Sequence, residues 1–208
     1  MKVITLSLGR MQTNCYLCIN EALKEAIIID PGDEGHRVVT ALDQAGAVPV
    51  AILLTHGHFD HIGAVEGLRS RYQIPVVAGI KEAALLRDPQ LNLSAQVPPS
   101  VTVEADRLCF DEEELEYAGL QLRVIETPGH TSGGVCYYLP QEAVVFSGDC
   151  LFYESIGNTQ FPTGQHRQLL ESIRTRLLTL PEQTVCYSGH GQPTDIRHEK
   201  YFNPWVSL

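Results

Sequence analysis

The sequence predicts an α/β protein, and three observations support this fold class. Short runs of β-branched and aliphatic residues alternate with polar stretches in which apolar residues recur at helical spacing. No low-complexity segment or long linker interrupts this alternation. A chain of 208 residues is long enough to bury a large core in one domain, or in two tightly fused halves.

The individual elements follow from these local patterns. Runs such as AIII and AILL, bounded by polar or turn residues, indicate buried strands, which we place at residues 3–8, 15–19, 26–29, 50–54, 75–78, 120–125, 134–139, 143–146 and 184–187. Helical spacing of apolar residues predicts helices at residues 34–44, 62–72, 80–86 and 165–178. Residues 88–99 contain three prolines and little periodicity, so we expect a loop there that joins two similar halves.

Charge and hydropathy exclude several classes of function. The 15 basic and 25 acidic residues give a formal charge of −10, which repels phosphate backbones and argues against a nucleic-acid partner. No apolar run approaches the roughly 20 residues that a membrane helix needs. The N-terminus also lacks the long apolar centre and cleavage site of a signal peptide, so we expect a cytoplasmic protein without a membrane partner.

The cysteine pattern predicts reduced thiols. Four of the six cysteines lie singly in or beside apolar runs, where a buried thiol is common: Cys109, Cys136, Cys150 and Cys186. Cys15 and Cys18 form a lone CxxC pair, but residues three apart in a strand face opposite sides of the sheet. A zinc ribbon needs a second such pair, so we expect no redox or zinc role for this one.

Clustered histidines and aspartates are the main functional signal. Three histidines and an aspartate occupy THGHFDH (His56, His58, Asp60 and His61), and TPGHTSGG, SGD and SGHG add His130, Asp149 and His190. Each of these motifs directly follows an expected strand, so the side chains should gather at one edge of the sheets. His36, His166 and His198 have polar neighbours and lie in no comparable cluster of ligand-type residues, so we expect them at the surface.

The residue types predict a metal site. Neutral imidazoles bind zinc and iron well, and carboxylates add charge and can bridge, so five histidines and two aspartates suit two divalent ions. His56 and His58 can face one ion across the glycine between them, while Asp60 and His61 can serve a second. Zinc is the favoured metal, and iron and manganese remain open.

The ordered motifs THGHFDH, TPGHTSGG, SGDCLF and SGHG, with an earlier IIIDPGD, resemble the metallo-β-lactamase superfamily. Within it the chain looks most similar to short bacterial members of the glyoxalase II group, the hydroxyacylglutathione hydrolases. Their sequences also resemble this chain in the segment MQTNCYL near its start and in the segment YFNPW near its end. The resemblance implies one domain over residues 1–208, an αββα sandwich of two mixed sheets flanked by helices.

The resemblance also assigns roles to individual residues. His56, His58 and His130 would hold one metal, Asp60, His61 and His190 the other, and Asp149 would bridge both. Asp30 would orient this cluster by hydrogen bonding without binding a metal. Asp60 and Asp149 would act catalytically by positioning a metal-bridging hydroxide that attacks an acyl thioester such as S-lactoylglutathione.

Two departures from the group bear on the small-molecule substrate. SIGNTQFPTG stands where short members read SIGRTDFPGG, so Asn158 and Gln160 replace an arginine and an aspartate, and we expect an amide pair in place of an ion pair. Only 18 residues follow His190 in this sequence, so we expect no C-terminal helical domain of the kind with which full-size members bind glutathione. The acyl group, the thiol carrier and the oligomeric state stay open, as does a role of residues 153–164 as a mobile lid.

Other functions fit less of the pattern. A persulfide dioxygenase with a single iron, and a two-metal hydrolase of another ester or lactone, are the main alternatives. A periplasmic lactamase is disfavoured by the missing signal peptide and the intact Asp60, and a nuclease by the acidic charge. A non-enzymatic, metal-stabilised module would not require all seven ligand positions to be filled.

Overall fold

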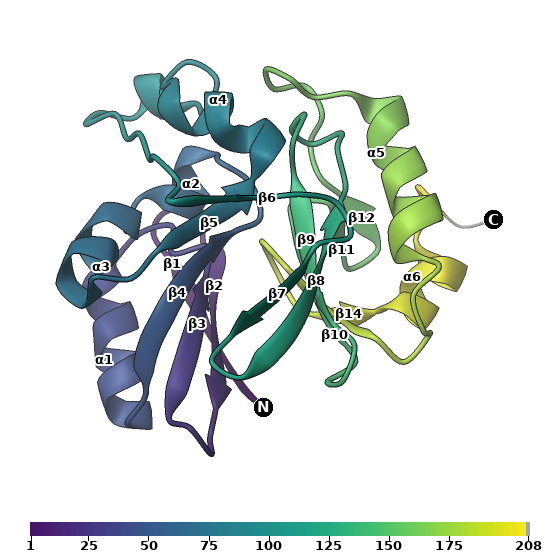
Figure 1. Ribbon diagram of the computed structural model, residues 1–208. Coiled ribbons are helices and arrows are strands. Elements are labelled where there is room, and N and C mark those ends of the chain that lie inside the picture. Colours follow the sequence, from purple (N-terminus) through teal and green to yellow (C-terminus); the bar gives the residue numbers. More distant parts are fainter. Residues whose placement is uncertain (207–208) are drawn as a thin grey trace.

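The computed structural model, which describes residues 1–206, is a four-layered sandwich (Figure 1). Two six-stranded mixed sheets face each other, with α1 (Gly35–Ala45) and α3 (Val65–Tyr72) on one outer side and α5 (His166–Ser172) and α6 (Ile196–Phe202) on the other. The αββα prediction is confirmed. No helix within residues 1–206 is long and apolar enough to cross a membrane.

The first sheet is built from the N-terminal half of the chain. Its strands follow sequence order: β1 (Lys2–Leu8), β2 (Thr13–Asn20), β3 (Glu25–Ile29), β4 (Val48–Leu54), β5 (Val76–Gly79) and β6 (Arg107–Cys109). From β3 to β6 the strands are parallel, and β3 to β5 are buried on both faces. Burial on both faces explains their continuous apolar runs.

The second sheet is built from the C-terminal half. Its order is β14 (Thr194–Asp195), β13 (Val185–Ser188), β10 (Val144–Gly148), β9 (Val135–Leu139), β8 (Leu120–Glu126) and β7 (Glu114–Tyr117). Strands β8, β10 and β13 run in the same direction, because β9 is antiparallel to both β8 and β10 while β13 is parallel to β10. A small hairpin of β11 (Leu151–Phe152) and β12 (Ser155–Ile156) follows β10.

Three apolar clusters hold the layers together. One lies between the sheets and includes Ile29, Leu53, Val124 and Phe146, and the other two lie between each sheet and its helices. The CxxC pair is divided between clusters, because Cys15 packs on the helix side of β2 and Cys18 on the inter-sheet side. All six cysteines are free, as predicted, and all six are buried.

Several expected elements differ from the structure. The helix expected at residues 62–72 is interrupted at Gly63 and Ala64, giving α2 (Phe59–Ile62) and α3. The one expected at residues 165–178 changes from α5 to the π-helical η3 (Ile173–Leu177). The helix expected at residues 80–86 is η1 (Ile80–Glu82) followed by α4 (Ala83–Arg87).

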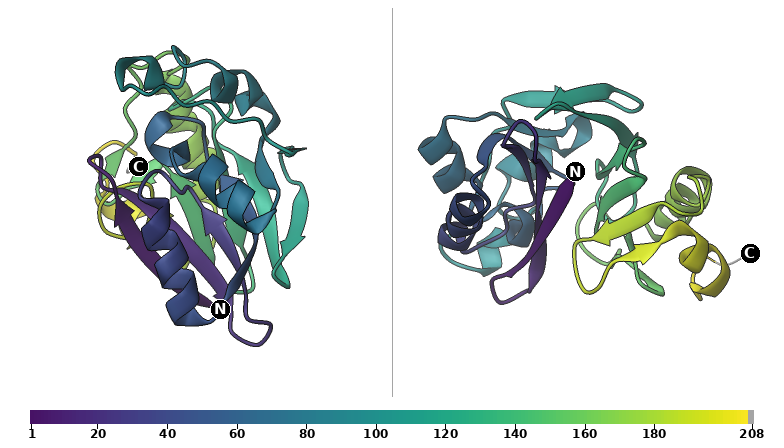
Figure 2. Two further views of the ribbon diagram at one scale, coloured as in Figure 1. Left: turned by 90° about the vertical axis from the view of Figure 1, so that its left-hand side faces the viewer. Right: turned by 90° about the horizontal axis from the view of Figure 1, so that it is seen from below.

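The junction between the two halves is also not where we expected it. Residues 88–99 form a loop that carries η2 (Ser94–Gln96), but the chain then returns to the first sheet as β6. The crossing from one sheet to the other therefore lies between Cys109 and Glu114, and Figure 2 shows the two halves side by side from below.

Candidate metal centre

The seven candidate ligands lie on loops that leave the ends of strands. The loop after β4 and the helix α2 carry His56, His58, Asp60 and His61; the ends of β8, β10 and β13 lead to His130, Asp149 and His190. Since β8, β10 and β13 run in one direction, their loops emerge at one edge, where they meet the loop of the first sheet.

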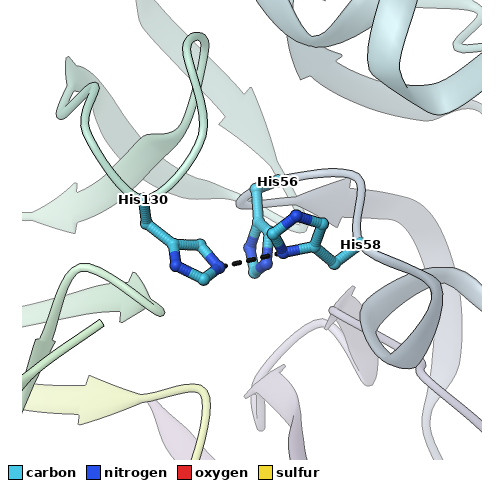
Figure 3. A group of neighbouring side chains, drawn as sticks. All are labelled: His56, His58 and His130. Carbon is cyan, nitrogen blue, oxygen red and sulfur yellow. Dashed lines mark hydrogen bonds between the residues drawn. The ribbon is translucent and has the colours of Figure 1, made fainter. Parts of the chain in front are cut away.

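His56, His58 and His130 form the first group (Figure 3). All three are buried, and the His58 Nδ1 and His130 Nε2 atoms face each other at 2.9 Å. The His56 ring lies with its centroid 4.9 Å from that of His58 and 4.8 Å from that of His130. One ligand atom from each residue lies within 4.8 Å of the others. Three imidazoles at this spacing can hold one divalent ion.

Asp60, His61 and His190 form the second group. The Oδ2 atom of Asp60 lies 3.7 Å from His61 Nε2 and 3.3 Å from His190 Nε2. Asp149 lies between the two groups, because its Oδ1 is 3.4 Å from His61 Nε2 while its Oδ2 is 3.5 Å from His190 Nε2 and 3.6 Å from His130 Nε2. Its two oxygens thus reach both groups, as a bridging carboxylate does.

Unpartnered polar atoms show that a divalent ion fits this site. Among the described residues, the Nε2 atoms of His56, His58 and His61 and the Oδ1 atom of Asp149 are buried without a hydrogen-bond partner. Buried polar atoms without partners are costly, and four in one place call for a cation or another ligand. The donor set of imidazole nitrogens and carboxylate oxygens suits zinc, iron or manganese.

The electrostatics of the site also suit metal binding. Burial and the neighbouring His130 lower the pKa of His58 to about 3, so this imidazole is neutral and can donate a lone pair. Burial alone would raise the pKa of Asp60, but His61 and hydrogen bonds from His190 and Thr13 outweigh it and lower that pKa to about 2. Asp60 is therefore an anion that can attract a cation.

Asp30 lies beneath the second group. Its Oδ1 accepts a hydrogen bond from the Thr55 backbone N–H at 2.8 Å, and its Oδ2 accepts from the Thr55 hydroxyl at 2.6 Å and contacts His61 Nδ1 at 3.0 Å. A carboxylate on Nδ1 leaves Nε2 of the same ring free to bind a metal. Asp30 has a left-handed backbone, with φ of 48°, a conformation in which aspartate is enriched.

Further positioning contacts were missed at the sequence level. The Thr13 hydroxyl donates to Asp60 Oδ2 at 2.9 Å, and the Asn14 amide donates to the carbonyls of Ser188 and Gly191, on either side of His190. Both residues lie in MQTNCYL, which contributed only to the resemblance. Their place at the start of a strand gave no physical signal of these contacts.

Residues 153–164 border the first group. The Asn158 carbonyl lies 2.6 Å from His130 Nδ1 and accepts its hydrogen bond, and the Phe161 ring stands edge-on to His58 with centroids 5.5 Å apart. The amide pair that we expected between the side chains of Asn158 and Gln160 is not formed. Instead, the Asn158 side chain accepts a hydrogen bond from the Gln160 backbone N–H. The other three histidines, His36, His166 and His198, lie outside the centre, and none is buried.

Fold and site together define a metal-dependent enzyme of the hydrolase type. The sequence profile of the metallo-beta-lactamase superfamily matches residues 8–190, and the chain belongs to this superfamily. It is 41% identical to the probable metallo-hydrolase YqgX of Bacillus subtilis, over 100% of this chain and 98% of that protein. It is 32% identical to the hydroxyacylglutathione hydrolase GloC of Haemophilus influenzae, over 100% and 99% of the two chains.

Solved structures agree with this assignment. The B3 metallo-beta-lactamase BLEG-1 matches with a TM-score of 0.94 and 44% identity over 100% of both chains. TTHA1623 in a di-iron-bound form matches with a TM-score of 0.86 and 34% identity, over 98% of this chain and 100% of that one. ETHE1 from Myxococcus xanthus matches with a TM-score of 0.82 and 31% identity, over 100% and 85%.

Proposed function

We propose that this protein hydrolyses small acyl thioesters, such as S-lactoylglutathione, at a site with two divalent metal ions, zinc being favoured. The single observation that carries the proposal is the Asp149 carboxylate, which lies between two complete groups of three ligand side chains. His56, His58 and His130 would hold one ion, Asp60, His61 and His190 the other. Similarity to GloC over the whole chain supports the thioester class.

The two ions would supply a hydroxide at neutral pH and polarise the substrate carbonyl. The protein's own residues set the geometry of this step. Asp149 and Asp60 would help to hold the two ions, and the Thr13 hydroxyl holds Asp60 in place through its 2.9 Å hydrogen bond. We assign Asp60 and Asp149 a catalytic role, because their carboxylates would orient the hydroxide that attacks the carbonyl carbon.

The surroundings of the site favour a thioester over an amide. Within residues 1–206, the side-chain hydrogen-bond partners of the candidate ligands are threonine hydroxyls, carboxylates and other histidines, with no lysine or tyrosine among them. A thiolate, whose conjugate acid has a pKa of about 8.5, departs without a dedicated proton donor, whereas an amine does not.

A pocket of about 400 Å³ opens beside one of the candidate ligands, Asp60. Apolar Met11, Phe59 and Val97 and the basic Arg10 also line it, whereas the other six candidate ligands and Phe161 do not. Its size is typical of small-molecule sites. We propose a small-molecule partner, with no nucleic acid or membrane required.

Phe161 is the clearest candidate for a substrate contact, because it is 38% exposed while standing edge-on to His58 and His130. We expect Phe161→Ala to raise the KM for an acyl thioester about tenfold, the effect of losing an apolar contact worth about 1.5 kcal/mol. Metal content should not change. Phe110→Ala, at a side chain that is 54% exposed in the turn after β6, is the matched control and should leave KM unchanged. If the KM of Phe161→Ala equalled that of Phe110→Ala, Phe161 would not be a substrate contact.

The deciding experiment measures metal content and activity on one preparation. Bound zinc, iron and manganese are counted per chain, and the same sample is assayed with S-lactoylglutathione, other acyl thioesters, a lactone, a β-lactam and glutathione persulfide. Two ions per chain with thioester cleavage is the expected result. The β-lactam tests the similarity to BLEG-1, and a single iron with persulfide oxidation would replace the hydrolase proposal with an oxygenase.

A further inference from the structure

Glu82 is a buried carboxylate that the proposed chemistry does not use. It is the last residue of η1, directly after β5, and its exposed fraction is 0%. It is not a member of either ligand group. A carboxylate in such a place is costly to bury unless each oxygen is well hydrogen-bonded, so its contacts are informative.

Glu82 accepts three hydrogen bonds from the two loops that carry the first ligand group. Its Oε2 accepts from the Gly57 backbone N–H at 2.9 Å, and Gly57 stands between His56 and His58. Its Oε1 accepts from the Thr131 hydroxyl at 2.7 Å and from the Gly133 backbone N–H at 2.9 Å. Thr131 directly follows His130. Every donor is thus within three residues of a candidate ligand. The donors lie on one loop that follows a strand of the first sheet and on one that follows a strand of the second.

The packing around Glu82 supports this connection independently. A Cβ atom at Gly133 would lie 2.4 Å from the Lys81 carbonyl carbon and 2.5 Å from the Glu82 nitrogen, so only glycine permits this approach of the second loop. A Cβ at Gly57 would lie 2.8 Å from Leu85 and 2.9 Å from Leu86, on α4. Both loops are therefore packed against the segment that carries Glu82.

We propose that Glu82 is the positioning residue of the first metal site: it fixes the loops of His56, His58 and His130 relative to each other and adds a negative charge behind them. This complements Asp30, which contacts His61 of the second group. The inference rests on the proposed metal centre and not on the thioester substrate. Loss of a residue that hydrogen-bonds a metal ligand typically costs about 10–100-fold in metal affinity, and we expect an effect of this order when the loops that carry the ligands lose their contacts with Glu82.

The substitution Glu82→Gln tests this role, because it keeps the size of the side chain but changes its hydrogen bonding and charge. In Glu82→Gln the amide has one accepting oxygen, so it can keep the pair of donors at Thr131 and Gly133 or the donor at Gly57, but not both. The amide nitrogen then faces another N–H group, and the negative charge is gone. Glu199→Gln is the matched control, because Glu199 is also 0% exposed and accepts from Glu154 N–H, Thr194 Oγ1 and Asn203 Nδ2, none of which is a candidate ligand.

The test is a competition titration of each purified, metal-depleted variant with Zn²⁺ and a colorimetric chelator, together with the absorption spectrum of Co²⁺ bound in its place. We expect Glu82→Gln to weaken one of the two sites about 10–100-fold and to change its Co²⁺ spectrum. Glu199→Gln should lower the melting temperature but retain both affinities. Wild-type affinities in Glu82→Gln, with a stability loss matching that of Glu199→Gln, would overturn the inference.

Two further variants identify the site that is weakened and guard against misfolding. In a His130→Ala background, which already lacks the first site, Glu82→Gln should cause no further loss of affinity; an equal additional loss would contradict the assignment. If Glu82→Gln does not fold, Thr131→Val removes a single donor to Glu82 and should still weaken zinc binding by about threefold or more. Wild-type affinity in Thr131→Val would then overturn the inference. Because no substrate is used, the result does not depend on the proposed activity.

Discussion

Replacing Asp149 by asparagine is expected to abolish most of the hydrolytic activity. Asparagine preserves the size of the side chain but removes the charge that lies between the two ligand groups, 3.4 Å from His61 Nε2 and 3.6 Å from His130 Nε2. We expect the metal content to fall from two ions to one or none per chain, and kcat/KM for an acyl thioester to fall by about a thousandfold or more.

The control for this prediction is Asp43→Asn, which removes an exposed carboxylate from α1 and should change neither quantity. Elemental analysis and steady-state kinetics on the same samples give both readouts. If Asp149→Asn retained two tightly bound ions and near-normal turnover, a bridging role for this residue would be wrong, even if the protein is a hydrolase.

The second large effect is expected at Asp30, and it concerns stability as well as metal binding. In Asp30→Ala, the Thr55 N–H, the Thr55 hydroxyl and His61 Nδ1 all lose their acceptor in a fully buried place. Leaving such groups unpaired costs about 3 kcal/mol or more. For a chain of this size, that corresponds to a melting temperature roughly 6–12 °C lower.

Asp30→Asn separates the possible causes of this effect. Asparagine also tolerates the left-handed backbone at φ of 48°, so it retains the local conformation while losing the charge and one acceptor oxygen. Thermal unfolding of metal-free and zinc-loaded protein should show an intermediate loss for Asp30→Asn, and a smaller zinc-induced stabilisation in both variants. An unchanged zinc-induced shift would limit Asp30 to a role in folding.

The sequence was most informative where residue type and spacing both carried chemistry. Seven ligand-type residues that follow strand ends predicted a single cluster, and the structure brings them together in that way. The strands β3, β4 and β5 were predicted from their continuous apolar runs. The structure explains these runs, because central parallel strands are buried on both faces. The opposite orientation of Cys15 and Cys18 followed from the period of a strand alone.

The elements that escaped prediction are short, polar or dependent on tertiary contacts. Strands β6, β11, β12 and β14 have two or three residues each, too few to show a period. Helix α6 did carry a local signal, because Asp195 caps it by accepting from the His198 N–H at 2.8 Å. Glu82 carried none: its three donors lie 25 to 51 positions away in sequence, and only the docked sheets bring them together.

Each ligand group draws two residues from the first sheet and one from the second. A bound ion would therefore connect the two halves of the molecule, and each half alone would offer it fewer ligands. Binding of the ion would stabilise the docked arrangement of the two sheets, and separation of the sheets would weaken the binding of the ion. Removal of the metal would therefore lower the stability of the whole fold, in addition to removing the activity.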